Sequence, residues 1–212
     1  MASPQKYRKL GDFRDYYNKQ SKFPWPVYFI AGNHEPYGWY EEHVNGFELT
    51  EGCHYLGRVS CQEIHGIKVV GISGIYSESK FTSQRPDISE FGYVSNKKYT
   101  YYNEKDIEKA MDFDSCDVLL LHDWPKGIIS ASDYKFLRGK RRSVNPEELG
   151  CEYTYLLIEK LNPKLLACGH MHYQYFNKIA INRNEIQICC LSLVESGSES
   201  VVIFDENLKI IV

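Results

Sequence analysis

The sequence predicts an α/β fold in a single domain, and three observations predict it. Short apolar runs that are typical of buried strands alternate with stretches of helical pattern. Polar side chains, each time including an imidazole, directly follow three of these runs. The chain has 212 residues, of which 43% are hydrophobic and 25% are charged. These values are ordinary for one globular domain with a sizeable core.

The elements follow one another in a regular order. The first segment, 5–20, is polar and aromatic and is expected to form a helix or a helix–loop piece, which Pro24 and Pro26 end. Two further helices are expected between the later apolar runs, over 104–111 and 151–161. The apolar runs that we expect to be strands are 27–31, 67–72, 117–121, 165–168, 186–191 and 201–204.

Imidazole and amide side chains stand where three of these strands end. Asn33 and His34 follow the first run, His122 follows the third, and His170 and His172 follow the fourth. In α/β folds, ligands bind beyond the carboxyl ends of strands. Taken singly, each residue would more often be a turn residue or a satisfied polar group. Their coincidence at three strand ends favours a metal site, because amide oxygen and imidazole nitrogen suit zinc, manganese or iron.

The spacing leaves the arrangement of the two later histidines open. His170 and His172 fall on the same side if the segment is extended, whereas a loop could present them to two adjacent ions. Two ions can clamp a phosphate and stabilise the leaving oxygen. His34, beside a ligand, is then placed to protonate that oxygen. Gly32 and Gly169 are expected to let the backbone turn sharply into the two loops.

These residues resemble the motifs of the calcineurin-like metallophosphoesterases. Gly32-Asn33-His34-Glu35, His122 and Gly169-His170-Met171-His172 are similar to the GNHE, H and GHxH motifs of that superfamily, in the same order. A finer likeness, over about residues 6–172, points to the RNA lariat debranching enzymes and to related bacterial proteins. The strings that carry it are 6–13, Tyr16-Tyr17, 29–35, Gly71-Ile72-Ser73-Gly74-Ile75-Tyr76 and His122-Asp123-Trp124-Pro125.

The resemblance implies a β-sandwich flanked by helices and hydrolysis of a phosphoester with two divalent ions, Mn, Fe or Zn. Asn33, His122 and His170 would bind one ion and His172 the other, and His34 would be the general acid. The debranching enzymes cleave the 2′-5′ phosphodiester at the branch of an intron lariat, so branched RNA is the implied substrate.

One departure from the family stands out. Its members open with a strand that bears Asp-x-His and a second strand that ends in Gly-Asp, whose Asp bridges the two ions. Neither motif is present, and Gly11-Asp12 lies in the string that follows the true Gly-Asp in the relatives. We therefore expect a single domain over residues 1–212 that is incomplete at its N-terminus and lacks its first strands, or else an inactive relative.

Two further features are candidates for substrate contact. The only dense basic cluster contains Arg138 and Arg141, which could hold substrate phosphates or form an ordinary solvated loop. Tyr101 belongs to a tyrosine-rich segment, Tyr93, Tyr99, Tyr101 and Tyr102, that corresponds to a substrate-recognition insertion in the debranching enzymes. Such side chains stack on unpaired bases or simply pack on a sheet. Asp123 is expected either to orient His122 or a neighbouring loop, or to cap a helix after Pro125.

Composition narrows the function classes. The formal net charge of −3 gives no overall attraction to nucleic acid. No apolar run is long enough to cross a membrane, and the first residues lack a secretory signal pattern. Seven cysteines without paired spacing indicate free thiols in a reducing compartment, hence an intracellular location, cytoplasmic or nuclear. Two alternatives stay open: the same chemistry on another phosphoester, and a non-catalytic binding protein.

Overall fold

The computed structural model describes residues 13–130, 132–134 and 149–211. Its strands are β1 Val27–Phe29, β2 Phe47–Thr50, β3 Cys53–Tyr55, β4 Val59–Ile64, β5 Ile67–Ile72, β6 Val118–Leu121, β7 Leu165–Cys168, β8 Tyr175–Ile181 and β9 Asn184–Cys190. Its α-helices include α1 Phe13–Tyr17, α2 Tyr37–Tyr40, α3 Glu78–Phe81, α4 Glu104–Met111 and α6 Glu152–Leu161. Short 3₁₀ helices are η2 Glu41–His43, η3 Ile88–Glu90, η4 Asn96–Tyr99 and η6 Val194–Ser200.

The larger sheet has the strand order β4-β5-β6-β7-β9-β8. Its centre is parallel, because β5 pairs with β6, β6 with β7 and β7 with β9 in the same direction. Antiparallel strands close the two edges, β4 on β5 and β8 on β9. Helix α4 lies in the β5–β6 crossover and α6 in the β6–β7 crossover, as the strand–helix alternation predicts. The carboxyl ends of β6 and β7 therefore lie side by side at one edge.

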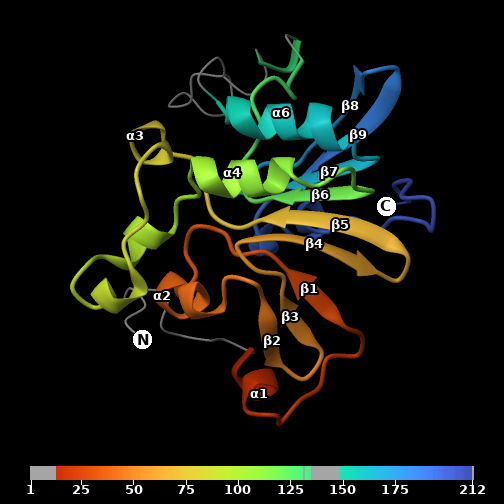
Figure 1. Cartoon of the computed structure of the whole chain (residues 1–212). Helices are drawn as coiled ribbons and strands as arrows, with labels where there is room; N and C mark the ends of the chain where they lie inside the picture. Colours follow the sequence, from red (N-terminus) through yellow and green to blue (C-terminus); the bar gives the residue numbers. More distant parts are fainter. Residues whose placement is uncertain (1–12, 131, 135–148, 212) are drawn as a thin grey trace.

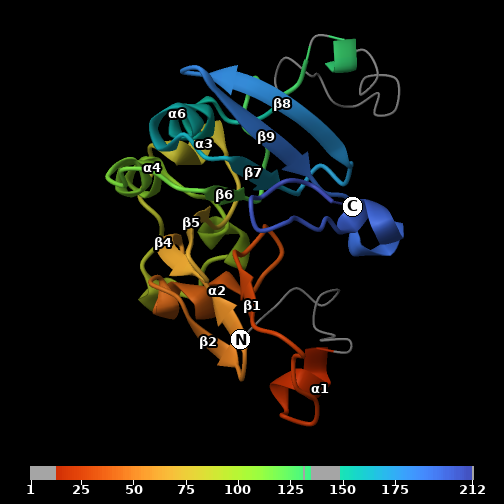
Figure 2. The ribbon, with the colours of Figure 1, turned by 90° about the vertical axis from the view of Figure 1, so that its right-hand side faces the viewer.

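Side chains alternate between the two faces of this sheet. Val70, Leu119 and Leu166 pack on the side of α4 and α6, in the main core. Their neighbours Val69, Val118 and Leu165 belong to a second cluster, which also contains Tyr28 and Leu208. Figure 2 shows the two helices on one side of the sheet and the C-terminal segment on the other. Both faces are covered, which explains why these strands are apolar throughout.

The smaller sheet consists of β1, β3 and β2 in that order, with β1 parallel to β3 and β3 antiparallel to β2. It lies beyond the β4 edge in Figure 1, together with α1 and α2. The chain is thus a mixed α/β fold with a large sheet flanked by helices, which confirms the predicted fold class. Strand β1 brings residues 30–35 toward the ends of the larger sheet, because Gly74 N donates to Ala31 O at 2.8 Å.

Most predicted elements are present, and a few predictions are wrong. Strands β5 and β7 and helix α4 have the expected bounds, and the expected helix at 151–161 is α6. Segment 201–204 is not a strand, since it has only one isolated bridge, Phe204 to Ile210. Of the opening segment, 13–17 is helical, and residues 5–12 lie outside the described part of the chain. Within the described residues, no helix has the length and apolar character needed to cross a membrane.

Candidate metal centre

The structure joins the first two predicted ligands directly. His122, just after β6, approaches Asn33, just after β1, with 3.0 Å between Nε2 and Oδ1. The two residues are 89 positions apart in the sequence. Because an amide oxygen can only accept, the imidazole nitrogen donates in this arrangement. Two strands from different sheets thus place an oxygen and a nitrogen side by side.

His170 joins this pair from the neighbouring strand. It follows β7, and its ring centroid lies 5.1 Å from that of His122 in an edge-to-face arrangement. The backbone N–H of Gly169 donates to the carbonyl of His122 at 2.9 Å, which holds the two loops together beyond the ends of the strands. Asn33, His122 and His170 therefore meet at one place, as the sequence predicted.

His34 and His172 lie on the exposed side of the same neighbourhood. Both influence the charge state of His122, together with His170. His170 and His172 have φ values of 65° and 55°, so the segment is a left-handed turn and not an extended strand. Of the two arrangements left open, the loop is the one observed, and the two imidazoles do not share a strand face.

Burial, followed by the nearby imidazoles of His170, His34 and His172, lowers the pKa of His122 to about 4. The ring is consequently neutral at physiological pH. A neutral imidazole is the form that binds a metal ion. The surroundings of His122 thus favour the neutral ring, which can act as a ligand. They disfavour a positive charge on this ring beside the other imidazoles.

The two glycines have a different role from the predicted one. Neither Gly32 nor Gly169 has a left-handed φ, so sharp turning is not their function. A Cβ on Gly32 would lie 2.6 Å from Cε1 of His122, which leaves no room for any side chain. A Cβ on Gly169 would lie 3.6 Å from Nδ1 of the same ring, an ordinary contact. Gly32 is required for close approach of the backbone to the ligand ring.

The residue types of this cluster suit one divalent ion. Two ligand atoms at about 2.1 Å from an ion, with ordinary bond angles, lie roughly 3.0–3.4 Å apart. The 3.0 Å between Asn33 Oδ1 and His122 Nε2 meets this spacing. No group of three or more His, Cys, Asp or Glu side chains within the described ranges could hold an ion by itself. A site at this place would therefore need the amide of Asn33 in addition to the imidazoles of His122 and His170.

Asp123, the residue after His122, has a buried side chain. Its Oδ2 accepts from the backbone N–H of Tyr76 at 2.6 Å and from the hydroxyl of Tyr102 at 3.0 Å. Burial raises the pKa of this carboxyl to about 7. Asp123 thus orders the loop after β5, one of the predicted roles. The helix-capping alternative is wrong, because Pro125 pairs with Cys151 in an isolated bridge and no helix begins there.

Of the predicted substrate-binding residues, only Tyr101 lies within the described part of the chain, and it is not part of this cluster. Tyr101 lines a separate hollow of about 170 Å³. Tyr99 and Tyr102 are buried core residues, whereas Tyr93 is 92% exposed. Arg138 and Arg141 lie outside the described residues. The hollow is lined by Lys80, Ser83, Gln84, Arg85, Pro86, Lys98, Tyr101 and Asn103.

A family model for calcineurin-like phosphoesterases matches residues 6–174, which is more than half of the chain. The chain belongs to the calcineurin-like phosphoesterase family. Members of this family are hydrolases that generally use divalent metal ions. The three strand-end motifs at Asn33, His122 and His170 all fall within the matched region.

Curated relatives of this family member are lariat debranching enzymes. That of Schizosaccharomyces pombe is 31% identical over 190 residues, covering 87% of this chain and 41% of the relative. That of Entamoeba histolytica is 31% identical and covers 81% and 49%, respectively. That of Saccharomyces cerevisiae is 30% identical and covers 86% and 47%. The chain therefore spans less than half the length of these relatives.

The sequence did not reveal the buried polar side chains that hydrogen-bond to the loops around Ala31 and Tyr99. Arg58 and Glu41 are buried and paired, and Ser73 accepts a hydrogen bond from Ala31 N at 3.1 Å. No local pattern marks these residues, because their partners lie 17 to 42 positions away. A charged residue such as Arg58 between two apolar segments gives a weak signal, since most arginines are exposed.

Proposed function

We propose that this chain contributes a divalent metal site to a phosphodiesterase of the lariat-debranching type. The observation that carries the proposal is the meeting of Asn33 and His122 at 3.0 Å, with His170 beside them, in a member of this family. Asn33, His122 and His170 would hold one ion. When bound, that ion would neutralise charge on the phosphoryl oxygens.

His34 is proposed as the general acid. It is adjacent to Asn33, its side chain is exposed, and it lies close enough to His122 to affect its charge state. An exposed imidazole can approach a bound phosphodiester and deliver a proton to the leaving oxygen. His172, on the same exposed side, is proposed as a ligand for a second ion in company with a carboxylate that the described residues do not include.

We further propose branched RNA as the substrate. The relatives with about 30% identity are named for lariat debranching. In this chain, the hollow that Tyr101 lines also contains Lys80 and Lys98, so an aromatic ring stands beside cationic side chains. This combination suits a nucleotide, whose base stacks and whose phosphate is anionic. The cluster with Arg138 and Arg141 is proposed as an additional phosphate contact.

The test compares substrates under one metal condition. The purified chain with Mn²⁺ is given a short RNA that contains a 2′-5′ branch, and in parallel an aryl phosphodiester. The proposal expects cleavage at the branch, weak activity on the aryl ester, and loss of about two to four orders of magnitude in rate for His34→Ala. Activity on the aryl ester alone would favour another phosphoester substrate.

A second candidate function has one observation in its favour. Among the described residues, no three His, Cys, Asp or Glu side chains form a group that could hold an ion, so the chain by itself could be a binding protein that retains the fold. Binding of the branched RNA without turnover, at any divalent metal, would support this alternative. His34-dependent turnover would exclude it.

A further inference from the structure

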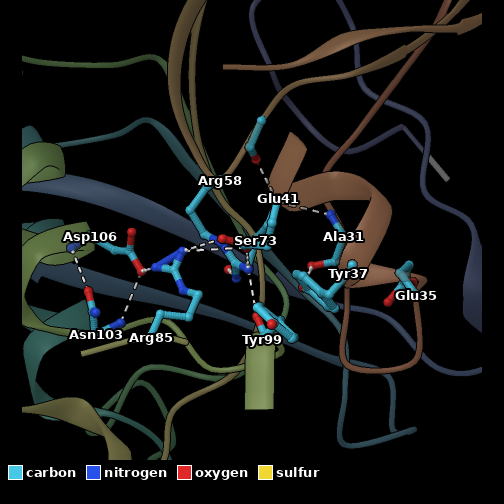
Figure 3. Close-up of polar contacts among 12 residues, drawn as sticks. Ala31, Glu35, Tyr37, Glu41, Arg58, Ser73, Arg85, Tyr99, Asn103 and Asp106 are labelled. Carbon is cyan, nitrogen blue, oxygen red and sulfur yellow. Dashed lines mark hydrogen bonds and ion pairs between the residues drawn. The ribbon is translucent and has the colours of Figure 1, made fainter. Parts of the chain in front are cut away.

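A buried tyrosine holds the backbone that carries the first metal ligand. The single hydroxyl proton of Tyr37, at the start of α2, is shared between two carbonyl oxygens: that of Gly32, which is the nearer acceptor, and that of Ala31 at 3.1 Å. Figure 3 shows Tyr37 beside Ala31. Gly32 immediately precedes Asn33. A carbonyl oxygen lies in one plane with the next residue's N and Cα. Fixing Gly32 O therefore fixes the peptide plane from which Asn33 extends.

The other bonds in this loop do not duplicate that contact. Ala31 is held independently, because its N–H donates to Ser73 Oγ at 3.1 Å and its carbonyl also accepts from Gly74 N at 2.8 Å. On the far side of the loop, Nδ2 of Asn96 donates to the carbonyl of Glu35 at 3.0 Å. Within the described chain, Gly32 O has its hydrogen bond from Tyr37, so the peptide before Asn33 depends on this hydroxyl.

Tyr37 is itself held rigidly. Its side chain is fully buried, and burial raises the pKa of its hydroxyl well above the ordinary value, so the hydroxyl keeps its proton and donates. The guanidinium of Arg58 lies over the Tyr37 ring, 4.5 Å from its centroid. Arg58 also donates to Ser73 O at 3.1 Å and to Tyr99 O at 2.6 Å. The ring can neither turn nor withdraw without breaking these contacts.

A series of ion pairs connects Arg58 to helix α4. Arg58 pairs with Glu41, Glu41 also pairs with Arg85 at 3.2 Å, and Arg85 pairs with Asp106 of α4. Figure 3 shows these side chains in a row that extends from Asp106, at the left of the view, toward Tyr37. All four charged groups are largely buried and balance one another. Buried ion pairs are often no more stabilising than apolar side chains of the same size, so stability alone does not account for the row.

From these contacts we propose that Tyr37 is a positioning residue for Asn33 and His34, and that the Arg58–Glu41–Arg85–Asp106 row holds Tyr37 in place. The proposal rests on the proposed function only in treating Asn33 as a ligand and His34 as the acid. The hydroxyl of Tyr37 sets the orientation of the loop backbone, and the loop sets the distance from Asn33 Oδ1 to His122 Nε2.

The test removes the hydroxyl and keeps the ring. Tyr37→Phe is compared with Tyr99→Phe, a matched control, because Tyr99 is equally buried and its hydroxyl donates to a single carbonyl, that of Asp87, at 2.9 Å. Two quantities are measured on each variant: the NMR signals of the Asn33 side-chain amide in the presence of a chelator, and the dissociation constant for Mn²⁺. Thermal unfolding of each variant reports any general loss of structure.

The proposal expects the Asn33 amide signals to shift in Tyr37→Phe and to stay in place in Tyr99→Phe. It expects Mn²⁺ to bind roughly tenfold more weakly to Tyr37→Phe, the lower end of the loss seen when an outer-sphere partner is removed, with no change for Tyr99→Phe at a similar unfolding temperature. Unchanged Asn33 signals, or equal effects of the two variants, would overturn it. If the unmodified chain binds no Mn²⁺, the proposed function fails, while the NMR comparison still decides the role of Tyr37.

Discussion

The Nε2 atom of His122 lies 3.0 Å from the Oδ1 atom of Asn33, across 89 positions of sequence and between two different sheets. Such a contact needs the β1 loop to pass directly under the imidazole, and Gly32 makes this possible. The proposed metal centre depends on this close approach of the backbone to the ring. The structure leads to predictions about substitutions at Gly32, Arg58 and Tyr101 and about the pH dependence of stability.

Gly32→Ala should damage the metal centre without unfolding the chain. The new Cβ would lie 2.6 Å from Cε1 of His122, so the ring or the loop must move. We expect Mn²⁺ to bind at least about tenfold more weakly, as for loss of an outer-sphere partner. Gly169→Ala is the matched control, since its Cβ would lie at an ordinary 3.6 Å from the same ring. Equal affinity in the two variants would contradict this account of Gly32.

Arg58→Met should destabilise the fold. Removing one member of a buried, hydrogen-bonded charge row leaves carbonyls and Glu41 without their partner, which costs about 3 kcal/mol or more. The free energy of unfolding, measured in urea, checks this. Lys178→Met is the control, because Lys178 and Glu185 form an exposed pair whose loss costs less than about 1 kcal/mol. A loss no greater than in the control would show that the row carries no stability.

The stability of the chain should fall between pH 7 and pH 5 in the presence of a chelator. The pKa of His122 is lowered to about 4 in the folded chain, whereas the unfolded chain has the ordinary value of 6.5. Above pH 6.5, His122 is neutral in both states and does not reduce the stability of the fold. As the pH falls from 6.5 toward 4, protonation of His122 in the unfolded state progressively lowers the free energy of unfolding. At pH 5 the unfolded state gains about 2 kcal/mol from protonation. His122→Asn should lack this part of the pH dependence, and an identical profile in both proteins would refute it.

Tyr101→Ala should weaken RNA binding and leave Mn²⁺ binding intact. Stacking of one base on an aromatic ring contributes roughly 1–3 kcal/mol, or about 5- to 150-fold in affinity. Fluorescence anisotropy with a short single-stranded RNA measures the effect. Tyr93→Ala is the control, since Tyr93 is highly exposed and does not line the hollow with Tyr101. Equal loss in both variants would show a non-specific surface effect instead of a base-binding site.

Much of the fold could be predicted because local patterns carry it. The runs at β5, β6 and β7 are apolar on both faces, since helices cover one side and the second apolar cluster the other. Strands β4 and β8 lie at the sheet edges and mix polar with apolar residues, so their pattern is weak. Segment 201–204 is β-rich in composition, but it lacks a strand partner among the described residues.

The centre could be predicted only at the level of residue type. Position after a strand singled out Asn33, His122 and His170, whose metal-binding role stays a prediction. The parallel neighbours β6 and β7 bring His122 and His170 together, whereas Asn33 comes from β1 of the smaller sheet. The role of Gly32 could not be predicted, because it depends on a ring 90 positions away. The role of Arg58 was missed for a similar reason, since its carbonyl partners lie 15 and 41 positions away. Tyr37 lies only five positions from Gly32, but the sequence does not show that the loop folds back onto its hydroxyl. Their partners come from the loops after β1 and β5 and from η4, and these partners have no local signature.

The most direct test of the central claim is calorimetric titration of the chain with Mn²⁺, alongside Asn33→Ala, His122→Ala and His170→Ala. His54→Ala is the control, because His54 stacks on Tyr28 in the smaller sheet. The account predicts one ion per chain, bound at least about tenfold more weakly in each of the three ligand variants and unchanged in the control. Binding that is unaffected by these substitutions, or absent from the unmodified chain, would contradict it.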